Sequence, residues 1–314
     1  MVAPVVATTT QRVTTTVATP DRVRPARSLW GDAWYTFTRD RLAMMGLFVL
    51  AFLVLAVIIG PYLYTGTQLI DFARSLEGPS PEHLMGTDDL GRDLLGRVLN
   101  GGRISIAVGL TAVFIAITLG TTVGAIAGYF GKLDNPLMRI TDLFLSLPVL
   151  PLLLVLVYLF RETLKAIFGP ELGIFLMIVF VIGILNWMPV ARLVRASFLS
   201  LKQKEFVEAA RCVGDGDGRI IFRHILPNSL SPVLVAATIG VGGAILTEST
   251  LSFLGLGFPS DVPTWGRLLF DAGNFIDIAP HWVIFPGLCI FIIVLSINFV
   301  GDGLRDALDP RRKI

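Results

Sequence analysis

Six long apolar stretches constrain this chain more than any other feature. They run from about residue 42 to 64, 104 to 130, 137 to 160, 172 to 190, 230 to 247 and 282 to 300. Each is long enough to cross about 30 Å of hydrocarbon as an α-helix. Only 16% of the residues are charged, against roughly a quarter in soluble domains, so much of the surface must face lipid. The sequence predicts an all-α integral membrane protein with about six transmembrane helices, located in the cell membrane.

Basic residues are concentrated in one predicted loop, which indicates the orientation. Residues 191–228 contain seven Lys and Arg, whereas residues 248–281 contain only Arg267. Because basic loops stay in the cytoplasm, both termini are predicted to be cytoplasmic. Residues 1–29 lack the apolar core of a signal peptide and are predicted to form a disordered cytoplasmic tail. The membrane domain is then 30–314. A net charge of +2 gives no support for a nucleic-acid partner.

The basic loop contains a short amphipathic pattern. Its apolar residues recur at the spacing of one helix face, namely Phe206, Ala209, Ala210 and Val213. Gly214 is placed to end this helix, and a second short helix is expected from Arg219 to Leu226, stopped by Pro227. Two interpretations follow from the pattern: a knob that docks against another protein, or a helix that lies on anionic lipid.

A second polar segment precedes the stretch 104–130. Thr87 or Asp88 is expected to cap a helix that continues to Leu99. Two acid-to-base pairs at helical spacing, Asp88 with Arg92 and Asp93 with Arg97, would stabilise it. A glycine pair at 101–102 would end it.

Small residues recur at four-residue intervals in two of the stretches, and such surfaces let membrane helices pack closely. They are Gly120, Gly124 and Gly128 in one, and Ala236, Gly240 and Ala244, with Gly243 beside them, in the other.

Four segments in order carry a resemblance to a known family. Glu208-Ala209-Ala210, then Gly214 and residues 225–227, resembles the "EAA" loop of ABC importer permeases. Residues 83–93, residues 251–257 with 263–266, and residues 301–311 are similar to motifs of the dipeptide/oligopeptide family, specifically its second (C-type) permease subunit. The run 214–218 is richer in glycine than this family's pattern.

The resemblance implies a type I ABC importer-like permease fold and a non-enzymatic transport role. It implies four kinds of partner: a homologous permease subunit, two ATPase subunits, an extracytoplasmic peptide-binding protein, and membrane lipid. The ATPase-coupling loop would be 201–228. Its contact residues would be Phe206, Glu208, Ala209, Ala210, Val213, Gly214, Asp217 and Arg219. No cofactor is expected on this chain, since no Gly-x-x-x-x-Gly-Lys-[Ser/Thr] loop occurs, and ATP-Mg would be held by the partners.

The expected cargo is di- or oligopeptides. Nickel or another small solute carried by the same architecture is the alternative, and an ion-coupled secondary transporter is a third class. Glu248, Asp88 and Asp93 are candidates for the substrate path or outer gate, because ionisable residues near membrane spans are often functional. The competing interpretation is hydrogen bonding and pairing within the bundle, as also expected for Asp142 with Arg139.

Overall fold

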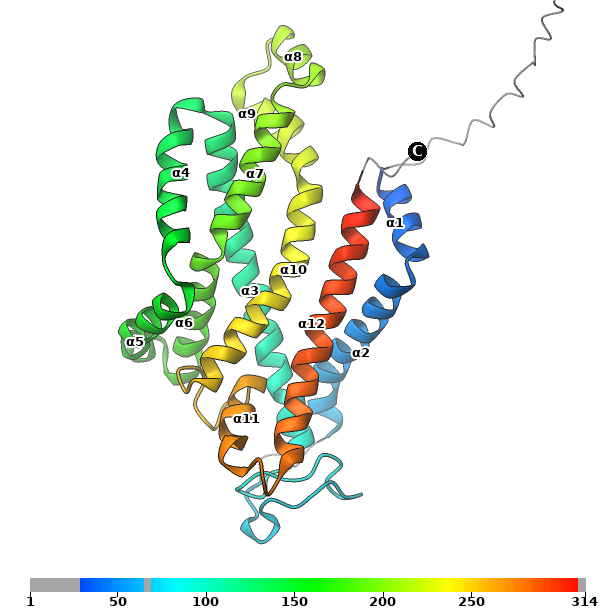
Figure 1. Ribbon diagram of the computed structural model, residues 1–314, viewed down its shortest axis with the longest axis vertical. Helices are drawn as coiled ribbons and strands as arrows, with labels where there is room; N and C mark the ends of the chain where they lie inside the picture. The colour runs from blue at the N-terminus through cyan, green and yellow to red at the C-terminus, as the bar shows by residue number, and fades with distance from the viewer. Residues whose placement is uncertain (1–28, 65–68, 310–314) are drawn as a thin grey trace, which may run out of the picture.

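The computed structural model describes residues 29–64 and 69–309, and all of its longer elements are helices (Figure 1). The predicted tail, except for Leu29, lies outside the described residues, as do residues 310–314 of the final motif. The helices are α1 Leu29–Arg39, α2 Arg41–Leu63, α3 Leu94–Tyr129, α4 Gly131–Ser146, α5 Val149–Phe168, α6 Pro170–Leu185, α7 Trp187–Leu201, α8 Glu205–Cys212, α9 Asp217–Arg219, α10 Leu226–Phe253, α11 Trp265–Ala272 and α12 Pro280–Leu308.

Four of the six predicted spans are single helical segments in the structure. They correspond to α2, α3, the continuous segment Asp217–Phe253 that ends in α10, and α12, and each is long and apolar enough to cross a membrane. The helix α3 begins at Leu94, well before the predicted start at residue 104. The first turn of α3 is therefore part of the same continuous helix that crosses the bundle.

The third and fourth predicted spans are bent, which corrects the expectation of straight helices. The pair α4 and α5 turns by 90°, and the pair α6 and α7 turns by 40°. Pro148 explains the first bend, because a proline disfavours helical backbone in the residue before it, and Leu147 is extended. The second bend lies at Asn186. The described chain has up to six crossings if each bent pair is one span.

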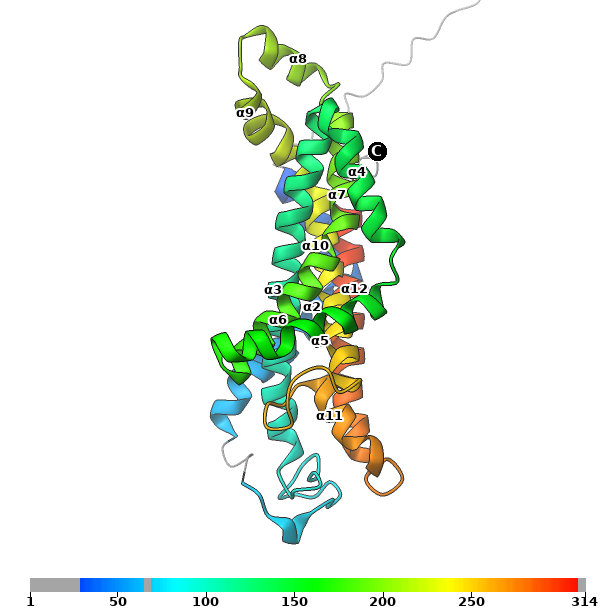
Figure 2. The same cartoon turned by 90° about the vertical axis from the view of Figure 1, so that its left-hand side faces the viewer.

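The elements sort to two ends of an elongated bundle (Figures 1 and 2). The segment from α8 to α9, the start of α1 and the end of α12 lie at one end, which we name the α8 end. Residues 69–93 and α11 lie at the other, the α11 end. Both ends of the described chain are thus on the same side of the bundle, as an even number of crossings requires.

Small residues of α3 allow α7 to pack closely against it in the centre of the bundle. A side chain on Gly120 would stand 2.6 Å from the Trp187 carbonyl oxygen, and one on Gly128 would stand 2.6 Å from Phe198. A side chain on Gly124 would meet the carbonyl of Ala191. The prediction of a packing surface is confirmed here: its partner is α7.

The small residues of α10 have a different surrounding. A side chain on Gly243 would meet nothing within 4 Å, and one on Gly240 would only touch Val113. Both glycines line an open apolar groove of about 490 Å³ formed by α3, α6, α7 and α10. At these two positions the helices of this chain leave the surface largely open, so the predicted packing surface is not filled from within the described chain.

The start of α3 also differs from the prediction. Asp93, and neither Thr87 nor Asp88, caps the helix by accepting the Gly96 amide at 3.0 Å. The helix continues through residues 101–102. These glycines do not end α3; their lack of side chains lets α11 approach it closely. A side chain on Gly102 would stand 2.7 Å from the Trp265 ring.

Candidate functional site

Residues 205–219, from α8 to α9, protrude beyond the bundle (Figure 2), and we name them the α8 knob. The knob carries apolar side chains on two faces of α8. Val207 and Ala210 are buried against the base of the knob. Phe206 is 40% exposed and Val213 is 86% exposed. The predicted face is thus split, with Ala210 inside and Phe206, Ala209 and Val213 outside. Glu208 is also exposed. Exposed apolar side chains on a protruding helix are available for contact with another protein or with a lipid surface.

The glycine-rich turn after α8 is held by one carboxylate. Gly214 has a φ of +90°, a conformation that side chains rarely adopt. Asp215 then accepts a hydrogen bond from Arg219 at 2.8 Å and faces Nε2 of His224 at 3.1 Å. The bond from Arg219, joined by that of His224, holds the pKa of Asp215 below its usual value. The turn is therefore anchored despite its glycines.

The second helix of the knob does not stop at Pro227, which corrects the prediction. From Asp217 the chain passes through a π-helical segment, Ile220–Ile225, directly into α10. Pro227 lies in the first turn of α10, where a missing backbone N–H is tolerated. The part of the knob from Asp217 onward is consequently continuous with a spanning helix, whereas α8 is joined to it by the turn at Gly214.

Tyr129, at the end of α3, joins three helices at the base of the knob. Its hydroxyl donates to Oδ1 of Asp217 at 2.5 Å. Its carbonyl accepts from Nζ of Lys202 at 2.6 Å, and the same ammonium lies 5.0 Å from its ring. Local sequence spacing gives no signal for Tyr129, since its partners are 73 and 88 positions away.

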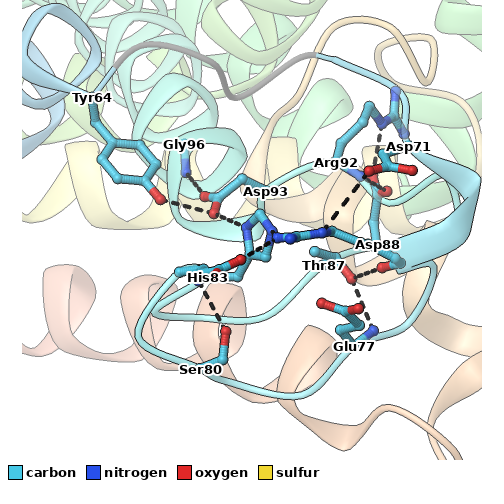
Figure 3. A network of polar contacts seen from close by, with 12 residues as sticks. Tyr64, Asp71, Glu77, Ser80, His83, Thr87, Asp88, Arg92, Asp93 and Gly96 are labelled. Atoms are coloured by element: carbon cyan, nitrogen blue, oxygen red, sulfur yellow. Dashed lines mark hydrogen bonds and ion pairs between the residues drawn. The ribbon is translucent and has the colours of Figure 1, made fainter.

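At the α11 end, Asp88 is the centre of a buried ion-pair network (Figure 3). It accepts from Nε of Arg92 at 2.7 Å, which confirms that predicted pair, and it also pairs with Arg97. Arg97 further donates to the carbonyl of Ser260 at 2.9 Å. The predicted pair of Asp93 with Arg97 is wrong, because the Arg97 side chain is directed to Asp88 instead.

Asp93 is engaged separately (Figure 3). One oxygen caps α3, and the other accepts from the Tyr64 hydroxyl at 2.9 Å and lies 2.8 Å from Nδ1 of His83. In the same segment Thr87 accepts the Glu77 amide at 2.9 Å. Both candidate acids of this segment are therefore buried and partnered inside the chain.

Glu248, the third candidate acid, is fully buried in α10. It accepts hydrogen bonds from Ser105 at 3.0 Å and Ser252 at 2.7 Å. Ser105 also accepts the Trp265 amide at 3.3 Å. The Glu248 side chain thus joins α3 and α10 beside the start of α11, which agrees with the predicted hydrogen bonding within the bundle.

Asp142 also has a different partner from the predicted one. Its carboxylate pairs with Arg192 of α7 at 2.5 Å, not with Arg139. Arg192 is 50 residues away in the sequence, so the pair connects α4 to α7.

Among the described residues, no group of three or more His, Cys, Asp or Glu is placed to hold a metal ion.

Comparison with solved structures supports the fold. The inward-facing MetNI methionine ABC transporter superimposes with a TM-score of 0.55 over 68% of this chain and 96% of that one, at 19% identity. At that identity the likeness concerns the fold alone, which is that of a type I ABC importer permease.

Sequence comparisons give the family. Residues 116–314 match the model of the binding-protein-dependent transport system inner membrane component, and residues 28–79 match that of the N-terminal TM domain of oligopeptide transport permease C. The dipeptide transport system permease protein DppC of Alkalihalophilus pseudofirmus is 43% identical over 94% of each chain. The oligopeptide permease OppC of Haemophilus influenzae is 41% identical over 91% of this chain and 89% of its own.

The glutathione permease GsiD of Pectobacterium atrosepticum is also 41% identical, over 93% of this chain and 94% of its own. All three relatives are named as permease subunits of transport systems and match nearly their whole length. The chain is therefore a multi-pass inner membrane protein that belongs to the family of binding-protein-dependent transport system inner membrane components.

Proposed function

We propose that this chain is the transmembrane permease subunit of an ATP-driven importer that moves di- or oligopeptides from an external binding protein into the cytoplasm. The observation that carries the proposal is the α8 knob, where Phe206 and Val213 are exposed on, and directly after, a short helix that precedes the continuous segment leading into α10. The names of the relatives, which include dipeptide and oligopeptide permeases, support the substrate class.

The knob is the contact for an ATPase subunit. Phe206 and Val213 enter an apolar groove of that partner, and the charged residues around them, Glu208 and Arg219 among them, meet its rim. ATP-Mg binds to the two ATPase subunits, and its tighter binding to their closed pair supplies the free energy. The knobs of the two permeases move together when that pair closes.

The motion reaches the membrane through contacts at the base of the knob. Asp217 follows α8, and its carboxylate is held by the hydroxyl of Tyr129. Tyr129 in turn is bound to Lys202 at the end of α7. A displacement of the knob therefore pulls on α3 and α7 as well as on α10.

The groove lined by Gly240 and Gly243 supports pairing with a homologous permease. Its glycines are not needed for packing within this chain, and membrane helices use small residues where another helix approaches closely. A second permease placed there leaves a path for the substrate between the two subunits.

Nickel or another small solute, carried by the same architecture, is the competing cargo. An ion-coupled transporter would be a different class, but the family to which the chain belongs works with a binding protein.

The proposed contact between the α8 knob and the ATPase is tested by asking whether the ATPase subunits co-purify with this chain. Phe206→Asp with Val213→Asp places two charges on the exposed face and leaves the buried Val207 and Ala210 in place. With an affinity tag on this chain, wild type is expected to retain the ATPase subunits during purification, and the double variant to lose them together with peptide uptake.

Leu133→Asp is the matched control, because Leu133 is 46% exposed near the α8 end but outside the knob. It is expected to retain the ATPase. Retention of the ATPase and of full uptake by the double variant would mean that the knob is not the contact.

A further inference from the structure

A pocket of about 430 Å³ lies on the side of α3 near the α11 end. Its α3 wall has Asn100, Arg103, Ile104 and Ala107, whose spacing places them on one helix face. The opposite walls come from the start of α6, through Glu171 and Phe175, and from residues 261–263 before α11. We name it the outer pocket. Its volume is in the range of sites that hold small ligands.

The charged side chains of the outer pocket have no partner of opposite charge within the described part of the chain. In the described part of the protein, the carboxylates of Glu171 and Asp261 form no ion pair and no hydrogen bond, and both residues are exposed. Arg103 has no acidic partner there. Its guanidinium contacts only Tyr62, with 3.5 Å to the hydroxyl and 5.3 Å to the ring centroid. By contrast, the nearby Asp88 and Asp93 are fully engaged.

The two signs of charge come from different walls. Arg103 belongs to α3, whereas Glu171 and Asp261 come from α6 and from the segment before α11. Two carboxylates on the walls of one pocket attract a cation. A guanidinium presents a fork of donors that matches a carboxylate. The ligand that fits has an ammonium at one end and a carboxylate at the other.

We infer that the outer pocket receives the free termini of a short peptide. Glu171 and Asp261 bind the amino terminus, and Arg103 binds the carboxyl terminus. The apolar wall, formed by Ile104, Phe175 and Val262 among others, contacts peptide side chains without hydrogen bonds that would select a sequence. The inference rests on the proposed function and assigns this chain a share in recognising peptides, beyond the binding protein.

The same arrangement argues against a bare divalent metal ion as cargo. The pocket offers two carboxylates and no His or Cys, and the positive charge of Arg103 disfavours a cation that has no carboxylate of its own. A peptide brings that carboxylate with it.

The experiment measures uptake into proteoliposomes that contain the complex purified through a tag on this chain. A radiolabelled dipeptide is supplied on the loaded binding protein at a fixed concentration. Glu171→Gln with Asp261→Asn is expected to lower uptake by more than about tenfold, because the loss of a single charge-assisted hydrogen bond already has about that effect. Arg103→Gln is expected to lower it by a similar factor.

The control is Asp277→Asn, an exposed acid at the same end but outside the pocket, and it is expected to leave uptake unchanged. Complex assembly is checked by gel filtration. If the double variant does not assemble, Glu171→Gln and Asp261→Asn are measured singly.

The outcomes separate the two proposals. No dipeptide uptake by wild type would overturn the proposed function itself. If wild type takes up the dipeptide and every pocket variant does so equally well, the inference about the outer pocket is overturned and the proposed function stands. Uptake of Ni²⁺ that rises in Arg103→Gln would also overturn it, in favour of a cation site.

Discussion

Tyr129 shows how one side chain connects the α8 knob to the bundle. It is almost completely buried, and its ring, carbonyl and hydroxyl each have a partner on another helix. Removing the hydroxyl alone would leave the ring and the carbonyl contact in place. A single substitution can therefore separate the link to Asp217 from the packing of α3.

Tyr129→Phe is expected to uncouple ATP hydrolysis from transport. The hydroxyl donates to the carboxylate of Asp217, and a hydrogen bond to a charged group contributes about 1.5–3 kcal/mol. Without this bond, a displacement of the knob would be transmitted less strongly to α3. We expect peptide uptake per ATP hydrolysed to fall roughly tenfold, with ATPase capture unchanged. Both quantities are measured in the same proteoliposomes.

Tyr158→Phe is the matched control, since Tyr158 is 77% exposed on α5 and should not alter the ratio. An unchanged ratio in Tyr129→Phe would show that the hydroxyl does not transmit the motion. A parallel loss of assembly and hydrolysis would show that its role is structural.

Of the side-chain pairs predicted from local spacing, only one is present, and the pairs that join distant segments were missed. Asp88 with Arg92 follows from adjacency along the chain, and it is present. Arg97 instead reaches a carboxylate nine residues back, and Asp142 reaches an arginine 50 residues away. Those pairs depend on where helices cross, which sequence periodicity does not report.

At the scale of helices, two sets of glycines with the same spacing have different roles. Gly124 of α3 lies against the backbone of α7, whereas Gly243 of α10 faces the open groove. In the sequence both look like helix-packing surfaces. Only the neighbours of each helix decide whether the contact is made within the chain or is left for another one.

Gly124→Ala is expected to destabilise the chain, because its new methyl group would overlap the Ala191 carbonyl and cannot be accommodated without moving α7. Overpacking of this kind costs about 1–3 kcal/mol. Gly243→Ala is the matched control, since its methyl group would meet nothing within 4 Å. Thermal unfolding of the isolated chain in detergent should show a lower midpoint for the first variant only. Equal midpoints would mean that α3 and α7 are not packed this closely.

Hydropathy found every apolar stretch but not the bends in two of them. The turn between α4 and α5 had a sequence signal in Pro148, which the length of the apolar run masked. The bend at Asn186 had little signal, because a single Asn within an apolar run can also belong to a straight helix. In such segments the path of the helix is set by packing against neighbours.

For the whole molecule, the two ends differ in the chemistry that they expose. The α8 end carries the knob, with the exposed Cys212 on α8. The α11 end carries the ion-pair network of Asp88 and the outer pocket. The concentration of basic residues in 191–228 predicts that the α8 end is cytoplasmic. The knob and the outer pocket would then face the two compartments that an importer connects.

That orientation gives the last prediction, which uses the native Cys212. In a Cys289→Ser background, a membrane-impermeant maleimide should label Cys212 in inside-out vesicles and leave it unlabelled in intact cells. Asp277→Cys, combined with Cys212→Ser, supplies the matched site at the α11 end and should show the opposite pattern, because Asp277 is exposed there. Labelling of Cys212 in intact cells would place α8 outside, where no ATPase could bind it, and both the topology and the α8 contact would have to be abandoned.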